Sequence, residues 1–336
     1  MIFGQKKKQH RLRRGKAGAA VLFLAAVLTA GMAAGCGKKT AVKAEQENRL
    51  AFERPSVMLL VATERNRYEQ IYTDQIWNVK VSEDGATFED YLLEQVKLFA
   101  TDLKVIGAMA GEQGISLDSS EKEQLRRLSE EYYGRLTEGD KAYTGAGLED
   151  VQKAYQEYCL ASKTVSQLTG GANLEISDSE AKVIQVNQIV LEDGETAGEI
   201  YSQVTAEGAD FESIARAASV EPEITCEIGK GERDITLETA AFALEEGEIS
   251  QVIESEGRYY ILQCLNPYDQ EATQKRKEEL SLLRKDKAFR EIYDAFLAEH
   301  PISISDEVWK DIRCVTEEDT STTDFFELYQ EYFPEK

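Results

Sequence analysis

Few side chains in this chain of 336 residues have the types and spacing that covalent catalysis or metal binding requires. The sequence contains two histidines, His10 near its start and His300 after the last long helical pattern. Without a histidine near a serine or cysteine nucleophile, no Ser-His-Asp triad can form, and no Gly-x-Ser-x-Gly elbow occurs. The loop Gly229-Lys230-Gly231-Glu232 lacks the Ser or Thr and the following helix of a phosphate-binding loop. We therefore expect chemistry without a nucleophile, a metal or a cofactor.

The cysteines do not form a metal-binding pattern either. The chain has five of them, with no CxxC pair and no zinc-ligand spacing: Cys36, Cys159, Cys226, Cys264 and Cys314. Cys226 and Cys264 lie on predicted strands of one small domain, so a disulfide between them is one alternative. The favoured alternative is that both are small buried apolar side chains.

The patterns in residues 181–268 predict a compact α+β domain. Alternating β-branched residues indicate strands, and apolar residues three or four apart indicate helices. The predicted elements are strand 183–191, helices 195–206 and 211–219, strand 224–228, a short helix ending at Leu244, and strands 249–255 and 259–265. This β-α-α-β-α-β-β order suits helices packed on a mainly antiparallel sheet.

One motif in this domain is specific enough to indicate a family. The run Ala240-Ala241-Phe242-Ala243-Leu244, with Gly247-Glu248-Ile249-Ser250 after it, resembles the parvulin (PpiC-type) peptidyl-prolyl isomerases. The supporting runs are Ile189-Val190-Leu191, Gly208-Ala209-Asp210-Phe211, Gly231-Glu232 and Tyr259-Tyr260-Ile261-Leu262. The resemblance covers about a quarter of the chain. It implies peptidyl-prolyl cis-trans isomerase activity and no cofactor.

The resemblance also implies a site. Isomerising an X-Pro bond means crossing a barrier of ~20 kcal/mol without breaking a covalent bond. The enzyme must hold the proline ring in an apolar slot and bind the twisted amide better than the planar forms. The two histidine positions of the family fall on Gln188 and Tyr260, and its acid or cysteine position falls near Glu221, which gives three candidate catalytic residues. The candidate substrate-binding residues are Arg233, Ile235, Leu237, Phe242 and Tyr259.

The absence of both family histidines leaves two functional alternatives. One is a working isomerase that uses Tyr260, Gln188 and Glu221. The other is a non-catalytic holdase chaperone with a degenerate parvulin domain, in which these polar side chains satisfy one another within the strands. An open apolar slot at Leu237, edged by Gln188 and Tyr260, would favour the enzyme. A slot filled by Arg233 would favour the holdase.

Helical patterns flank the parvulin-like domain, which we place at residues 176–268. Residues 55–175 contain four predicted helices, 56–76, 88–110, 121–136 and 148–168, and residues 269–300 form a fifth, long helix. We expect the long helix to return and complete one helical domain, because the apolar stripes must be buried against each other. Helices before and after a parvulin domain resemble the exported foldase chaperones of the PrsA and SurA type. The predicted fold class is thus α+β, a SurA-N-like helical chaperone domain with an inserted parvulin-like domain.

The N-terminal residues carry an export pattern. Residues 1–35 are a signal peptide with a basic start and an apolar core, and small residues immediately before Cys36 resemble a bacterial lipobox. Cys36 would then be lipidated and residues 36–54 would form a polar tether. An uncleaved signal anchor is the alternative. Both place the protein outside the cytoplasm, on the outer face of the bacterial cytoplasmic membrane.

The charge of the remaining chain limits its partners. Removing residues 1–35 takes away seven basic residues, which leaves 32 basic against 62 acidic residues and a net charge of about −30. Such a surface repels nucleic acid and anionic lipids. We expect unfolded or partly folded exported polypeptides as partners, and a homodimer through the helices stays open. The acidic and aromatic tail, residues 301–336, more often packs on its own protein than docks a partner.

Overall fold

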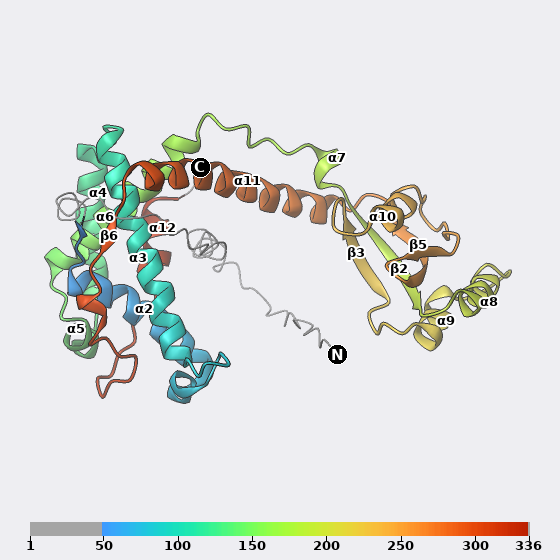
Figure 1. Ribbon diagram of the computed structural model, residues 1–336, viewed down its shortest axis with the longest axis horizontal. Coiled ribbons are helices and arrows are strands. Elements are labelled where there is room, and N and C mark those ends of the chain that lie inside the picture. Colours follow the sequence, from blue (N-terminus) through green and yellow to red (C-terminus); the bar gives the residue numbers. More distant parts are fainter. Residues whose placement is uncertain (1–48, 335–336) are drawn as a thin grey trace, which may run out of the picture. The chain divides into compact units, whose positions relative to one another are not determined.

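A computed structural model describes residues 49–334 in two units (Figure 1). The predicted signal peptide, Cys36 and most of the predicted tether lie outside the described residues. The first unit contains the described residues up to Gly171 and those from Asp286 onward, and the second is Ala172–Lys285. Among the described residues, no helix combines the length and the apolar character that crossing a bilayer requires.

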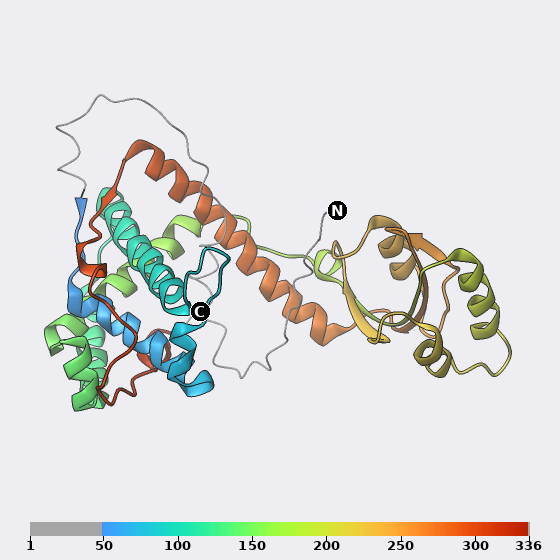
Figure 2. The same cartoon turned by 60° about the horizontal axis from the view of Figure 1, so that its bottom comes forward.

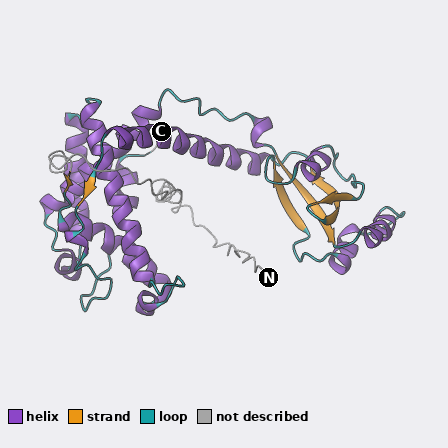
Figure 3. Ribbon diagram, in the orientation of Figure 1, coloured by secondary structure: helices purple, strands orange, loops and turns teal. Residues whose placement is uncertain are grey.

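The first unit is a bundle of helices around one apolar core (Figure 3). Its long helices are α2 (Arg54–Tyr72), α3 (Phe88–Glu112), α4 (Ser119–Arg135) and α6 (Leu148–Thr169), and α5 (Glu138–Thr144) is shorter. A short parallel pair joins β1 (Arg49–Leu50) to β6 (Ser303–Ile304), and η3 (Glu307–Trp309) follows. Capping boxes begin α3, α4 and α5, because a Thr or Asp at each start is paired with an acid three residues on.

The C-terminal tail packs in the core of this helical unit. Helix α12 (Phe325–Tyr332) buries Phe325, whose ring stacks on Tyr155 with centroids 4.1 Å apart. The Tyr155 hydroxyl donates to the Phe325 carbonyl oxygen at 3.0 Å. Upstream of α12, the buried Asp140 carboxylate accepts the backbone N–H groups of Ser321 and Thr322 at 2.8 and 3.0 Å. The tail is therefore a structural part of the unit.

Helix α2 ends four residues before the predicted end at Ile76. Thr73 has φ +66° and ψ 171°, and the 3-10 helix η2 (Asp74–Asn78) begins directly after it. The break returns Trp77 onto α2, where its ring is buried and its Nε1–H donates to Glu69 Oε1 at 2.6 Å. Burial of the indole thus outweighs continuation of the helix.

The second unit is a four-stranded antiparallel sheet in the order β3-β2-β5-β4. Its strands are β2 (Val183–Leu191), β3 (Thr225–Gly229), β4 (Ile253–Ser255) and β5 (Arg258–Asn266). After the short α7 (Asp178–Ala181), helices α8 (Gly194–Val204) and α9 (Phe211–Ala218) cover one face, and α10 (Ile235–Phe242) covers the other (Figure 2). Each face has its own apolar cluster, because alternate side chains of β2 and β5 point to opposite sides.

Strand β4 is shorter than the predicted strand 249–255. Ser250 interrupts the ladder, because its backbone N–H donates to the Leu262 carbonyl while its hydroxyl accepts the Leu262 N–H at 2.9 Å. A two-residue turn then joins β4 to β5, with positive φ at Glu256 (+50°) and Gly257 (+76°). Two positive φ angles are typical of the hairpin turn that matches strand twist.

The sheet order excludes the disulfide between Cys226 and Cys264. Val186 on β2 pairs with Cys226 on one side and with Cys264 on the other. Two strand spacings put the two cysteines about 10 Å apart, beyond the reach of about 7 Å for a disulfide. Both are free thiols, as are Cys159 and Cys314, and Cys264 is fully buried. The disulfide alternative was wrong, and the favoured reading as apolar side chains describes Cys264 well.

Helix α11 (Gln270–Glu299) begins in the second unit and ends in the first. In the second unit, Thr273 Oγ1 accepts the backbone N–H of Val183 at 3.1 Å, so the helix start is tied to the start of β2. In the first unit, Phe289 and Tyr293 are buried in the helical core. The second unit is therefore inserted in sequence between two parts of the first.

Candidate active site

The antiparallel pair β2–β5 brings Gln188 and Tyr260 to one face of the sheet. Gln188 pairs with Leu262, and Tyr260 pairs with Val190, so the two side chains are diagonal neighbours on the α10 face. Gln188 is 9% exposed, and its Nε2 donates to the Glu223 carbonyl oxygen at 2.9 Å. The amide thereby holds the loop that leads into β3. Tyr260 is half-buried at the edge of the apolar cluster.

Glu221 lies in the same loop and forms an ion pair that the sequence analysis missed. Its Oε1 accepts from Arg258 Nη1 at 2.7 Å, and this hydrogen bond raises the pKa of Arg258. Arg258 opens β5 two residues before Tyr260, so both point to the α10 face. The loop is fixed beside them because Val220 N–H donates to the Val190 carbonyl at 2.9 Å.

Helix α10 packs apolar side chains against this face. Asp234 caps the helix by accepting the Thr236 N–H at 3.0 Å, and the helix then buries Leu237 to 3% exposure. Leu237 packs in one cluster with Val186 and Leu262. Ile235, in the first turn of α10, is 70% exposed and therefore lies at the rim and not among the buried side chains.

Arg233 and Cys226 also meet on this face. The exposed Arg233 lies near the thiol of Cys226, which is on β3 and packs against the α10 cluster. Burial raises the pKa of Cys226 above its usual 9.0, although Arg233 acts in the opposite direction. The thiol is therefore protonated at neutral pH and is a poor nucleophile.

The two remaining predicted pocket residues lie on opposite faces of the sheet, Phe242 against the α10 cluster and Tyr259 on the other side. Phe242, at the end of α10, is half-buried, with Lys182 Nζ 5.4 Å from its ring centroid. Tyr259 belongs to the opposite face, where it packs with the α8 and α9 cluster and close to Gly194. Alternation along β5 requires this, because Tyr259 and Tyr260 are consecutive. The structure thus separates Tyr259 from the other candidates on the α10 face, which are Gln188, Tyr260, Glu221, Arg233, Leu237 and Phe242.

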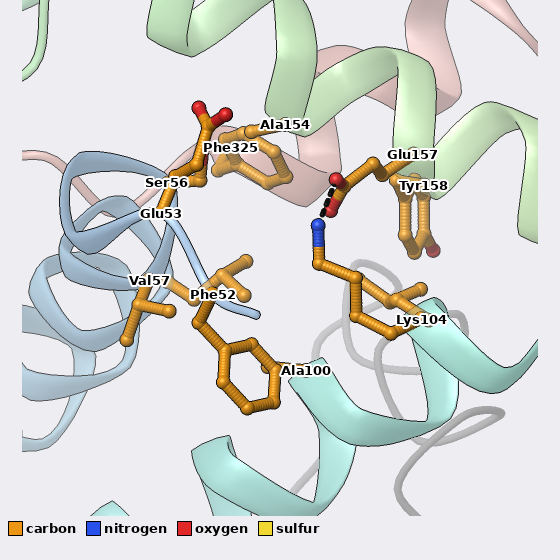
Figure 4. Close-up of a pocket in the computed structure, with 12 residues that line it drawn as sticks. Phe52, Glu53, Ser56, Val57, Ala100, Lys104, Ala154, Glu157, Tyr158 and Phe325 are labelled. Atoms are coloured by element: carbon orange, nitrogen blue, oxygen red, sulfur yellow. Dashed lines mark hydrogen bonds and ion pairs between the residues drawn. The ribbon is translucent and has the colours of Figure 1, made fainter. Parts of the chain in front are cut away.

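A small cavity in the helical unit is a second hollow to consider (Figure 4). Phe52, Val57, Ala100 and Ala154 line it, and Lys104 and Glu157 form an ion pair at its edge. Its volume is about 20 Å³, which is room for about one water molecule. It is too small for a peptide side chain, so the α10 face is the better candidate site.

The second unit contains a segment that matches a known family. Residues 192–266 match the family described as "Rotamase: PPIC-type PPIASE domain". The chain carries a parvulin-type domain. The parvulin recognition and the α+β fold class predicted from the sequence are thereby confirmed.

Curated relatives are named as foldases. The Foldase protein PrsA of Caldanaerobacter subterraneus is 24% identical over 66% of this chain and 73% of its own length. That of Halalkalibacterium halodurans is 26% identical over 48% of this chain and 54% of its own length. The Foldase protein PrsA of Staphylococcus aureus is 27% identical over 60% of this chain and 69% of its own length.

Solved structures of PrsA proteins are also similar to this chain. The Bacillus anthracis peptidylprolyl isomerase PrsA is 20% identical, covering 62% of this chain and 98% of that one, with a TM-score of 0.35. The foldase protein PrsA of Streptococcus pneumoniae is 22% identical. The match covers 69% of this chain and 97% of that one, with a TM-score of 0.28.

Proposed function

We propose that this chain is a foldase that binds X-Pro segments of unfolded exported polypeptides on its α10 face and accelerates their cis-trans isomerisation. The observation that carries the proposal is the grouping of Tyr260 and the Glu221–Arg258 ion pair at the edge of the apolar cluster under α10. This grouping lies within a domain that matches a peptidyl-prolyl isomerase family.

The proposed reaction needs positioned donors and an apolar contact, since no covalent bond breaks. The Tyr260 hydroxyl and the Arg258 guanidinium are donors on this face, and either can stabilise the amide oxygen as it leaves conjugation. The exposed side chains Ile235 and Val220 offer apolar contact at the rim. Gln188 acts as a positioning residue, because its amide holds the loop that carries Glu221. Among the described residues of the second unit there is no histidine, so a histidine titration should be missing from the pH profile.

The holdase is the second candidate function, and one observation favours it. The positive charge of Arg233 lies near the Cys226 thiol, on the face where the proline ring would bind. A charged side chain there competes with an apolar ring, because the guanidinium loses hydration when it is covered. The chain would then bind clients without turning them over.

The deciding measurement is the rate of cis-to-trans conversion of short X-Pro peptides with the full chain and matched variants. We expect acceleration that falls by about tenfold or more in Tyr260→Phe, because one transition-state donor is lost. Tyr259→Phe removes the same hydroxyl from the opposite face and should leave the rate unchanged. Arg233→Ala should keep or raise the rate. No acceleration for any X, from a chain that still suppresses aggregation of an unfolded protein, would establish the holdase.

We also propose that Cys36 is lipidated and tethers the protein to the outer face of the cytoplasmic membrane. The motif before Cys36 supports this part of the proposal. Metabolic labelling with a fatty-acid analogue tests it, because Cys36→Ser should abolish the label. A labelled Cys36→Ser chain would contradict the proposal.

A further inference from the structure

The helical unit displays a second apolar surface, far in sequence from the α10 face. At the connection between α2 and α3, five large apolar side chains are about half exposed or more. They are Ile71 (65%), Tyr72 (48%), Val79 (51%), Val81 (48%) and Tyr91 (48%), and we call them the α2–α3 patch. Val81 and Tyr91 line one hollow, and exposed apolar patches mark interaction sites on soluble proteins.

The patch is built on an ordered base. Phe88 lies at the centre of an aromatic cluster, with ring centroids 4.9 Å from Tyr68, 5.8 Å from Trp77 and 5.8 Å from Tyr91. The turn above it is closed by the Val81 N–H, which donates to the Ala86 carbonyl at 2.9 Å. The exposed side chains are therefore held in place by packing and backbone hydrogen bonds. An open hollow of about 570 Å³ lies between this turn and the start of α3.

Acidic residues predominate in the segment that carries the patch. Between residues 69 and 95 the sequence holds seven acidic residues and one basic residue, a net charge of −6. Of these, Asp90 and Glu94 line the hollow itself together with Tyr91 and Val81. Lys80 is the basic residue. The surface therefore combines apolar contact with a negative potential.

The combination of apolar and acidic side chains limits which ligands the α2–α3 patch can bind. Nucleic acid and anionic lipid are repelled by the carboxylates of Asp90 and Glu94, and a second copy would bring the same two carboxylates against them. A polypeptide stretch with apolar residues flanked by lysine or arginine would complement both the apolar contact and the negative charge of the patch. We infer that the α2–α3 patch binds basic, apolar stretches of unfolded polypeptides, independently of proline. The client class rests on the proposed foldase function, which this inference deepens.

The test uses a proline-free peptide, so that the α10 face is not required. A fluorescein-labelled peptide with four lysines around an apolar stretch is titrated with the full chain in mild detergent, and anisotropy gives the Kd. Its analogue with the lysines replaced by glutamates is the ligand control. We expect Ile71→Ser/Tyr91→Ser to raise the Kd about tenfold, because two exposed apolar contacts are lost. Leu283→Ser changes a side chain that is 62% exposed on α11 and should leave the Kd unchanged.

A charge-reversed variant tests the acidic side chains without touching the apolar side chains. Glu83→Lys/Glu94→Lys should weaken binding of the lysine peptide and strengthen binding of the glutamate analogue. Binding of the lysine peptide should also weaken between about 50 and 500 mM salt.

Three results would overturn the inference. They are equal binding of the two peptides, an unchanged Kd in Ile71→Ser/Tyr91→Ser, or a dimer in sedimentation that this double variant dissociates. The X-Pro assay separates this inference from the proposed function. Peptide binding that depends on the patch, in a chain without isomerase activity, would refute catalysis and leave the patch standing. The reverse result would refute the patch alone.

Discussion

Replacing Asp140 with asparagine tests whether the C-terminal tail is a structural part of the helical unit. The Asp140 side chain is fully buried, and its carboxylate accepts four hydrogen bonds of 3.0 Å or less. Two come from the Thr137 backbone N–H and hydroxyl, and two from the backbone N–H groups of Ser321 and Thr322. One carboxylate thus caps α5 and fixes the segment before α12.

The expected loss follows from these contacts. An asparagine oxygen can still accept from Ser321 and Thr322, but its NH₂ group then faces the Thr137 N–H and cannot accept. A hydrogen bond to a charged group contributes about 1.5–3 kcal/mol, and a lost helix cap costs about 1 kcal/mol. We expect Asp140→Asn to lower the free energy of unfolding by about 3 kcal/mol at pH 7.

Tryptophan fluorescence during urea unfolding measures this change in the helical unit alone. The chain has two tryptophans, Trp77 and Trp309, and both pack in the helical core. Asp150→Asn is the matched control, since Asp150 also caps a helix but accepts the Gly147 N–H and holds no part of the tail. This control should cost about 1 kcal/mol or less.

The pH dependence gives a second check. Burial would raise the pKa of Asp140, but the N–H groups of Thr322 and Ser321 and the contacts of Thr137 outweigh it and hold the pKa below 3.8. Because the pKa of Asp140 is lower in the folded than in the unfolded protein, the ionised side chain stabilises the fold above pH 3.8. This contribution is lost as the pH falls through the pKa of the folded state. The difference in the free energy of unfolding between wild type and Asp140→Asn should therefore decrease below pH 3.8. A loss under 1 kcal/mol, or an equal loss from Asp150→Asn, would refute the reasoning.

Three further substitutions have outcomes that follow from the described contacts. Thr73→Gly should stabilise the helical unit by about 1 kcal/mol in urea unfolding, because glycine adopts φ +66° without strain; a destabilised variant would contradict this. Gly139→Ala should cost more than about 2 kcal/mol in the same assay, since an added Cβ would overlap the Asp319 backbone; a wild-type midpoint would show that the tail packs differently. Asp102 has a pKa raised mainly by burial, and its Oδ2 has no hydrogen-bond partner within the described part of the chain. Wild type should therefore lose stability as the pH rises through the folded pKa, and Asp102→Asn should remove this slope and be about 1 kcal/mol more stable at pH 7; an unchanged slope would assign it to other groups.

Much of the second unit could be predicted because its patterns are local. The run 183–191 alternates β-branched residues, and the strand β2 (Val183–Leu191) has the same bounds. Helices α5 and α12 could not be predicted in this way. Helix α5 has seven residues and is held by contacts to residues 319–322, almost two hundred positions away in the sequence. Such elements depend on tertiary packing and not on propensity.

Some features of the candidate site also follow from local patterns, and others depend on tertiary structure. The shared face of Gln188 and Tyr260 follows from the alternation of strand residues, once the register of β2 and β5 is known. The same alternation could have shown that Tyr259 cannot line that face. Arg258 had no signal in the sequence, because its pairing with Glu221 depends on the path of the loop after α9.

The insertion within the chain sets the order in which the protein can be assembled. Ribosomes release the N-terminal part first, and domains generally fold in that order. Here the core of the helical unit stays incomplete until Phe289, Tyr293 and Phe325 have emerged, so the first part to be synthesised is the last to be finished. The inserted unit contains its own sheet and both apolar clusters within Ala172–Lys285. During synthesis, helices α2 to α6 must therefore wait with exposed apolar stripes. This protein thus passes through the kind of unfolded, apolar state that we propose it binds in others.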